Sequence, residues 1–250
     1  MIVETELYDY FYRAEARHWW FRARRAILAD VLDRMHLEGD ARIADMGCGT
    51  GGMLPVLARH GKVTGVDEAP LAREYCARSG FPDVESPAEW EAAGHRFDLV
   101  TAFDVIEHVK DDVAFLKSID DHLVPGGLLL ATVPAYPFLW STFDEMNHHY
   151  RRYTRQALKQ SLTASGFSVL RLTHMNFFLF PALAGARLFD RAFGHPPRNE
   201  AERRRMVESW FRVGPMNGVL ENIFASERYW LRMGDFPFGA SILTVARKPA

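Results

Sequence analysis

The sequence predicts an α/β protein with a Rossmann-like, doubly wound, seven-stranded and mostly parallel sheet, with N-terminal helices and a helical insertion before the last strand. Short apolar stretches alternate with helical patterns between residues 41 and 133, which is typical of a parallel sheet covered by helices on both faces. A glycine-rich segment, residues 47–52, follows the first of these stretches. The run at 128–133 is apolar throughout, which favours a strand buried on both faces.

Residues 1–38 are expected to form an N-terminal cap of two helices, because aromatic and aliphatic residues recur there at the spacing of one helix face. The core, residues 39–174, then alternates strands with helices. Gly80 is a typical helix end, and a Pro-Gly-Gly turn at 125–127 leads into a strand. We expect strands at residues 41–45, 62–66, 83–86, 97–103 and 128–133, and helices at 53–60, 71–79, 88–93 and 109–123.

The pattern changes beyond residue 136. We expect the last strand to be antiparallel and to complete the sheet, with the insertion folded over the carboxyl edge of the strands. A length of 250 residues with 48% hydrophobic content fits one domain, residues 1–250, around one core. The expected elements are a helix at 155–165, a strand at 167–173, the insertion at 175–235 and a strand at 240–246 within the closing segment 236–250.

Composition argues against several partners and locations. The chain has 30 basic and 32 acidic residues, so no overall positive field favours nucleic acid. Its two cysteines, Cys48 and Cys76, suit a reducing compartment, and the N-terminus lacks the basic and apolar regions of a secretory signal. The most apolar stretch, 175–186, is shorter than the roughly 20 residues that span a bilayer. We therefore expect a cytoplasmic protein without an integral membrane segment.

The strongest chemical signal is the segment DMGCGTGG at residues 45–52, followed by Asp67 at the end of the second predicted strand. Both features face one crevice in a parallel sheet. Glycines allow a ligand to approach the backbone closely and supply dihedral angles that a β-carbon disfavours. A carboxylate at position 67 can accept hydrogen bonds from two ribose hydroxyls. This pattern predicts a nucleoside site.

The glycines alone leave the cofactor open. Gly47, Gly49 and Gly52 also satisfy the dinucleotide pattern G-x-G-x-x-G. Asp45 favours a different ligand, because a carboxylate two residues before the first glycine repels a pyrophosphate but attracts the α-ammonium group of a nucleoside that carries an amino acid. The alternative for Asp45 is a cap at the strand end.

Four segments resemble, in order, the successive motifs of class I S-adenosylmethionine-dependent methyltransferases: IADMGCGTG at 43–51, VD at 66–67, FDLV at 97–100 and LVPGGL at 123–128. The segment FDVIEHV at 103–109 resembles the fourth motif of the small-molecule branch that includes ubiquinone-biosynthesis type enzymes. The resemblance covers about residues 40–134. It implies methyl transfer from S-adenosyl-L-methionine to a small-molecule acceptor, with S-adenosyl-L-homocysteine as product.

The resemblance also implies cofactor contacts outside the glycine loop. The end of the fourth strand lies beside the methionyl part and the sulfonium in such enzymes, the residues after the third strand contact adenine, and the aromatic and basic helix at 18–25 covers the cofactor. Arg24 then pairs with the cofactor carboxylate; the alternative is an ordinary amphipathic helix. The predicted contacts are Trp20, Arg24, Asp45, Gly47, Cys48, Gly49, Gly51, Asp67, Glu68, Ala88, Glu89, Phe103, Asp104, Val105 and His108.

Methyl transfer to a hydroxyl needs a base, and a histidine that titrates near neutral pH suits that task. His148 and His149 are the candidate catalytic residues, in the segment DEMNHHYRRY at 144–153 after the fifth strand, and we favour His149. The alternative is that His149 and Arg152 hold this loop through hydrogen bonds. Oxygen is the first-choice acceptor atom, with nitrogen and carbon left open.

Potential metal ligands are numerous, but their spacing matches no strong metal signature. Asp111 and Asp112 lie at a helix start, where acidic residues complement the helix dipole. We therefore expect no required metal. The other potential ligands are Asp104, Glu107, His108, Asp144 and His149.

The insertion is rich in aromatic residues, so much of it must be buried. It either caps an apolar acceptor, with peripheral contact to a membrane, or packs against the sheet or a second copy of the chain. We expect a monomer or a homodimer. Two other functions remain open, a nicotinamide-dependent oxidoreductase and a catalytically silent protein that binds the cofactor.

Overall fold

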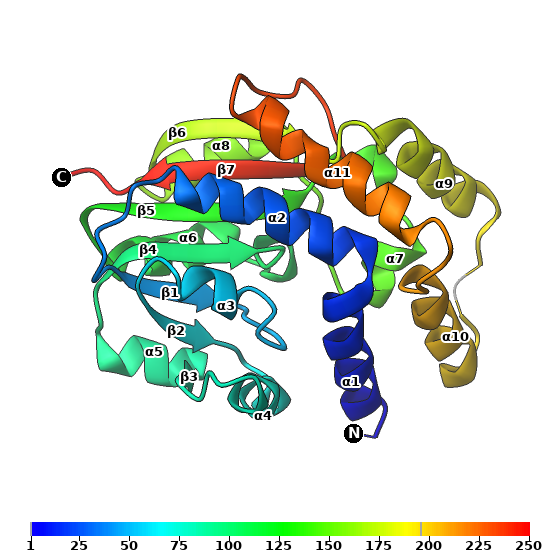
Figure 1. Cartoon of the computed structure of the whole chain (residues 1–250), viewed down its shortest axis with the longest axis horizontal. Helices are drawn as coiled ribbons and strands as arrows, with labels where there is room; N and C mark the ends of the chain where they lie inside the picture. Colours follow the sequence, from blue (N-terminus) through cyan, green and yellow to red (C-terminus); the bar gives the residue numbers. More distant parts are fainter. Residues whose placement is uncertain (1, 196) are drawn as a thin grey trace.

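The computed structural model describes residues 2–195 and 197–250, with side chains described from residue 8 onward. Seven strands form one sheet in the order β3-β2-β1-β4-β5-β7-β6 (Figure 1). All pairs are parallel except those of β7, which runs antiparallel to both β5 and β6. The predicted fold class and the antiparallel last strand are confirmed. The strands are β1 (Arg42–Met46), β2 (Lys62–Val66), β3 (Val84–Glu85), β4 (Phe97–Phe103), β5 (Leu123–Pro134), β6 (Ser168–Met175) and β7 (Ser241–Arg247).

Helices cover both faces of the sheet. On one face, α2 and α11 pack together over β1, β4 and β7 through a buried aliphatic and aromatic cluster. On the other face, α5, α6 and α8 bury Trp90, Leu116 and Leu158 against β4 and β5. The two predicted N-terminal helices are confirmed. The helices outside the insertion are α1 (Ile2–Arg17), α2 (Trp19–Asp33), α3 (Leu54–Leu57), α4 (Pro70–Arg78), α5 (Pro87–Ala93), α6 (Asp112–Asp121), α7 (Thr142–Met146) and α8 (Arg155–Ala164).

Three predicted boundaries are wrong. The helix expected at 53–60 is only α3, because the chain tightens into i→i−3 turns before it enters β2. The helix expected at 109–123 is α6, which begins where the Asp111 side chain accepts from the Ala114 amide; the short 3₁₀ turn η1 (Ile106–His108) precedes it. The turn expected at 125–127 lies inside β5 as a bulge, across which the pairing register shifts from Phe97↔Leu123 to Leu99↔Leu128.

The insertion between β6 and β7 divides into two parts. Helices α9 (Phe180–Phe193) and α10 (Glu200–Trp210) lie beyond the carboxyl ends of the parallel strands, whereas α11 (Asn217–Leu231) runs along α2 (Figure 1). The packing alternative therefore describes α11, whereas a cap over an acceptor stays a prediction for α9 and α10. In the described part of the chain, no helix combines the length and apolarity that crossing a membrane requires.

Candidate functional site

The glycine-rich loop connects β1 to α3 at the carboxyl edge of the sheet. The amides of Gly47 and Cys48 both donate to the carbonyl of Val66, at 2.7 and 3.1 Å, which ties this loop to the end of β2. Gly47 has a φ of 67°, and a β-carbon there would lie 2.5 Å from a methyl group of Val105. The backbone of this loop therefore requires glycine at position 47 for two independent reasons, conformation and space.

Gly47→Ala is expected to destabilise the fold by about 1–3 kcal/mol, from the left-handed backbone and the clash with Val105. Gly39→Ala is the matched control, because nothing lies within 4 Å of a β-carbon there. Denaturant unfolding of both variants measures the difference. Equal stability of the two variants would contradict the packing described for this loop.

Asp67 is oriented by the loop that it faces. One carboxylate oxygen accepts from the Gly49 amide at 2.8 Å, and the other accepts from the Ala69 amide at 2.9 Å. Each carboxylate oxygen has further acceptor capacity, and the side chain is half-buried. The adjacent Glu68 is exposed. Asp67 is thus held against the glycine loop. It does not line the cavity next to that loop, so its predicted contact with ribose stays a prediction.

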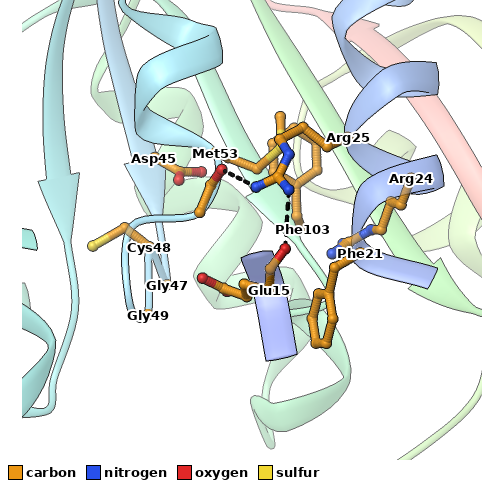
Figure 2. A pocket seen from close by; sticks show the side chains of 11 residues that line it. Glu15, Phe21, Arg24, Arg25, Asp45, Gly47, Cys48, Gly49, Met53 and Phe103 are labelled. Carbon is orange, nitrogen blue, oxygen red and sulfur yellow. Dashed lines mark hydrogen bonds between the residues drawn. The ribbon is translucent and has the colours of Figure 1, made fainter. Parts of the chain in front are cut away.

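Asp45 lies at the base of a small cavity between the glycine loop and the N-terminal helices (Figure 2). The side chain is buried and accepts a hydrogen bond of 2.6 Å from the Thr101 hydroxyl. Burial raises the pKa of Asp45 to about 7. A cationic group in this cavity would favour the charged carboxylate. The cavity, named the charged cavity below, is lined by Glu15, Phe21, Arg24, Arg25, Asp45, Gly47, Cys48, Gly49, Gly52, Met53 and Phe103.

Glu15 is a lining residue that the sequence did not indicate. It projects from α1 into the charged cavity, accepts from the Thr50 hydroxyl and lies directly over Gly52. Arg25 links α1 to the glycine loop, because its guanidinium donates to the carbonyls of Glu15 and Gly52 at 2.9 and 3.1 Å. Burial raises the pKa of Glu15. A glutamate in a helix far upstream of the glycine loop carries no motif, so only the packing of α1 shows its position.

Arg24 pairs within the protein. Its guanidinium lies 2.8 Å from the carboxylate of Asp104, donates to the Thr132 hydroxyl at 2.7 Å and lies over the ring of Trp20 at 4.9 Å. Asp104 itself has a φ of 56°, which is uncommon for a residue other than glycine. Trp20, Arg24, Phe103 and Asp104 are thus brought together, as expected, whereas the predicted pairing of Arg24 with a cofactor carboxylate stays a prediction.

One pair of predicted contacts, Ala88 and Glu89, lies outside the charged cavity, whereas Cys48 lines it. Ala88 and Glu89 are exposed at the start of α5, where Glu89 and Ser86 form a capping box, and neither lines the charged cavity. The thiol of Cys48 is buried 4.0 Å from that of Cys76, and both cysteines are free. A role of Ala88 and Glu89 at adenine therefore stays a prediction.

A second, larger cavity of about 520 Å³ adjoins the charged cavity, with which it shares Glu15, Phe21, Arg24 and Phe103. Most of its walls are apolar, and α9 and α10 cover it. We name it the aromatic cavity. Its aromatic lining is Phe11, Trp19, Trp20, Phe21, Phe103, Phe143, Trp210 and Phe211, and its polar lining includes Glu107, His108, Asn147, His149, Arg152, Asn176 and Arg187.

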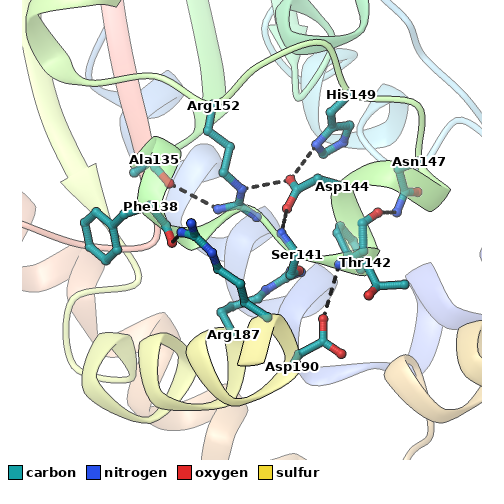
Figure 3. Close-up of polar contacts among 12 residues, drawn as sticks. Ala135, Phe138, Ser141, Thr142, Asp144, Asn147, His149, Arg152, Arg187 and Asp190 are labelled. Atoms are coloured by element: carbon teal, nitrogen blue, oxygen red, sulfur yellow. Dashed lines mark hydrogen bonds and ion pairs between the residues drawn. The ribbon is translucent and has the colours of Figure 1, made fainter. Parts of the chain in front are cut away.

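His149 lines the aromatic cavity, whereas His148 is exposed and contacts Arg203. The Nδ1 atom of His149 lies 2.8 Å from a carboxylate oxygen of the fully buried Asp144. The same oxygen accepts from Nε of Arg152 at 2.8 Å (Figure 3). Burial alone would raise the pKa of Asp144, but the bonds from His149 and Arg152 lower it. His149 and Arg152 therefore do hold this loop through hydrogen bonds to Asp144, as the alternative proposed. Nε2 of His149 takes no part in these bonds.

Asp144 owes its position to α7, a short helix that the sequence analysis missed. The Ser141 amide donates to its second carboxylate oxygen at 3.0 Å, in a capping box at the start of α7. Arg152 also donates to the Ala135 carbonyl at 3.1 Å and so links the loop to the end of β5. The Ser-x-x-Asp pattern at 141–144 is typical of a capping box and could have predicted the start of this helix from the sequence.

The seven-stranded sheet with one antiparallel strand, the glycine loop after β1 and the acidic residue after β2 define a class I methyltransferase domain. The chain belongs to the family described as methyltransferase domain, whose model matches residues 10–172. A ubiquinone biosynthesis O-methyltransferase from Methylobacterium sp. (strain 4-46) is 41% identical over 97 residues, which are 36% of this chain and 39% of that protein. The chain thus matches less than half the length of this curated relative.

Solved structures share the fold at low sequence identity. A phosphoethanolamine N-methyltransferase 2 from Haemonchus contortus, solved with S-adenosylhomocysteine, is 20% identical with a TM-score of 0.53, over 90% of this chain and 52% of that one. The [4+2]-cyclase SpnF is 19% identical with a TM-score of 0.54, over 90% and 81% of the two chains. These similarities concern the fold alone.

Proposed function

We propose that this protein is an S-adenosylmethionine-dependent methyltransferase that methylates an oxygen atom of an apolar small molecule. The observation that carries the proposal is the pair of adjoining cavities. The charged cavity carries the carboxylates of Asp45 and Glu15 beneath the glycine loop, and the aromatic cavity next to it is large enough for a small-molecule acceptor. Phe103 and Arg24 line both cavities, so the two bound molecules would meet there.

The residues around the charged cavity fit an adenosyl amino acid. Asp67 has acceptor capacity for ribose hydroxyls, and buried Asp45 suits an α-ammonium group. A pyrophosphate would be repelled by these carboxylates, which disfavours a nicotinamide cofactor. When bound, S-adenosylmethionine supplies a methyl group activated by the positive sulfur. The protein contributes mainly by orienting donor and acceptor.

We propose that His149 acts on the acceptor hydroxyl. Asp144 holds Nδ1 of its ring, so Nε2 is the nitrogen left to face the aromatic cavity. The Methylobacterium relative is named an O-methyltransferase of ubiquinone biosynthesis, which supports oxygen as the accepting atom. The aromatic lining supports an acceptor with a ring or a prenyl chain. A cytoplasmic location and a monomeric or homodimeric state stay predictions.

The proposal is tested by incubating the purified protein with methyl-labelled S-adenosylmethionine and lipid-soluble extracts of cells that lack the protein. We expect label to enter an apolar product. Because one protein of this fold is named a [4+2]-cyclase, binding of the donor without transfer of label would support the catalytically silent alternative. Calorimetric binding of a nicotinamide dinucleotide instead of S-adenosylmethionine would support an oxidoreductase.

Donor binding is expected to strengthen about 10-fold between pH 6 and pH 8. The pKa of Asp45 is raised to about 7 by burial, so the carboxylate is mostly protonated at pH 6 and mostly charged at pH 8, and only the charged form attracts an ammonium group. Calorimetry with S-adenosylhomocysteine measures the trend. Asp45→Asn should bind more weakly and lose this pH dependence. A pH-independent affinity in the unaltered protein would contradict the role of Asp45.

A further inference from the structure

Three potential metal ligands converge on one wall of the aromatic cavity. Glu107 and His108 belong to the 3₁₀ turn η1 after β4, and His149 belongs to the loop after α7. One donor atom from each lies within 4.8 Å of the others. The two imidazole rings are perpendicular, with centroids 4.6 Å apart. Residues that are far apart in sequence therefore form one cluster of donors.

Glu107 is the most unusual member of this cluster. Its side chain is fully buried, and apart from a contact with its own backbone amide neither carboxylate oxygen has a hydrogen-bond partner among the residues that the structure describes. An unpaired charge in such a place is costly, because burial removes its hydration without replacing it. The nearby arginines favour the charged form of Glu107, but burial outweighs them and raises the pKa of Glu107 well above its usual range. Arg24 pairs with Asp104 and Arg152 pairs with Asp144.

Both histidines are oriented as metal ligands usually are. A metal-binding imidazole commonly donates its other ring N–H to a carboxylate or a backbone carbonyl, which fixes the tautomer and the ring orientation. His149 has Asp144 as this partner, at 2.8 Å from Nδ1. His108 makes a hydrogen bond with the backbone of Asn147. Each ring therefore has one nitrogen in use and one with a free lone pair.

We propose that Glu107, His108 and His149 bind one divalent transition-metal ion, of the zinc type, at the wall of the aromatic cavity. Two imidazoles and one carboxylate are the donor set of several catalytic zinc sites, whereas magnesium prefers oxygen donors alone. Donors bound to one tetrahedral ion at about 2.1 Å lie about 3.4 Å apart. Because the three donor atoms lie within 4.8 Å of one another, side-chain movements on the order of an ångström close the cluster around an ion.

The proposed site differs from the expectation in the sequence analysis, which was that the protein requires no metal. Linear spacing could not show it, because His149 joins Glu107 and His108 only through the packing of η1 against the loop after α7. Three protein ligands leave coordination positions for a molecule in the cavity. If the proposed function is correct, an acceptor hydroxyl bound to the ion would lose its proton to water more readily. The ion would then bind His149 through the lone pair with which the histidine would otherwise accept a proton, so His149 would act as a ligand and not as the base.

The experiment measures metal binding without donor or acceptor, so its outcome is independent of methyl transfer. The full chain is stripped with a chelator, dialysed and titrated with Co²⁺, whose visible absorption reports its coordination, and with Zn²⁺ by calorimetry. We expect one site per chain. Glu107→Gln and His149→Gln should each weaken binding at least 10-fold, since each removes a ligand.

The control is His148→Asn, a neighbouring exposed histidine with a φ of 56°, a backbone conformation that asparagine tolerates well. This variant should bind the metal like the unaltered chain. Glu107→Gln keeps the size of the side chain and replaces an unpaired buried carboxyl group, so it is expected to fold, which circular dichroism checks. The proposal is overturned if no ion binds to the stripped chain, or if Glu107→Gln binds as tightly as the control. Binding of the ion without transfer of label would contradict the proposed function and leave this site intact.

Discussion

Replacing His149 with alanine is expected to lower turnover about 100-fold or more while leaving donor binding nearly unchanged. The side chain lines the aromatic cavity and lies outside the charged cavity, so its loss should affect the acceptor hydroxyl and leave the cofactor in place. The magnitude is that of losing a group that assists removal of a proton. Initial rates with labelled donor and calorimetry with S-adenosylhomocysteine measure the two effects separately.

Two further variants separate catalysis from loop support. Asp144→Asn removes the charge that faces Nδ1 of His149 and should lower turnover as well, by allowing the wrong tautomer. His148→Asn should leave turnover close to that of the unaltered protein if His149 alone acts on the acceptor. Equal losses of donor binding and turnover in His149→Ala would show that the residue only holds the loop together with Arg152.

Asp67→Ala is expected to weaken donor binding by about 2 kcal/mol, or roughly 30-fold, because charge-assisted hydrogen bonds to two ribose hydroxyls are lost. The carboxylate also accepts from the Gly49 and Ala69 amides, so part of the loss comes from a looser glycine loop. Asp67→Asn retains one acceptor oxygen and should give an intermediate affinity. Calorimetry with S-adenosylhomocysteine is the measurement.

The control for Asp67 is Glu74→Ala, which changes an acidic residue on the exposed surface of α4 that pairs with Arg78 at 3.4 Å. It should bind the donor normally. Unchanged affinity in Asp67→Ala would remove the ribose assignment. The proposed cofactor would then have to be held by Asp45 and the N-terminal helices alone.

The sheet could be predicted because its signals are local. Alternation of apolar and helical segments reports which side of each element is buried, and the observed β2 and β4 match the expected ranges. The site could be predicted only where one short segment carries it. Gly47, Asp45 and Asp67 lie at strand ends, and parallel strands bring their carboxyl ends to one edge.

Other parts of the site depend on contacts between distant segments. Glu15 reaches Thr50 only because α1 packs over the glycine loop. The pairing of Arg24 with Asp104 joins α2 to the end of β4. No periodicity marks such pairs, since each residue alone is compatible with an exposed, solvated position.

The amino-acid sequence by itself determined the alternation of strands and helices up to β5, the glycine loop and the acidic residues at two strand ends. Steric limits on the backbone and the period of apolar residues are properties of short segments, so they are visible in the chain. The tertiary structure alone decided that α9 and α10 cover the aromatic cavity and that His149 joins Glu107 and His108. A cavity is the space left between packed elements, and its shape and charges exist only after those elements come together.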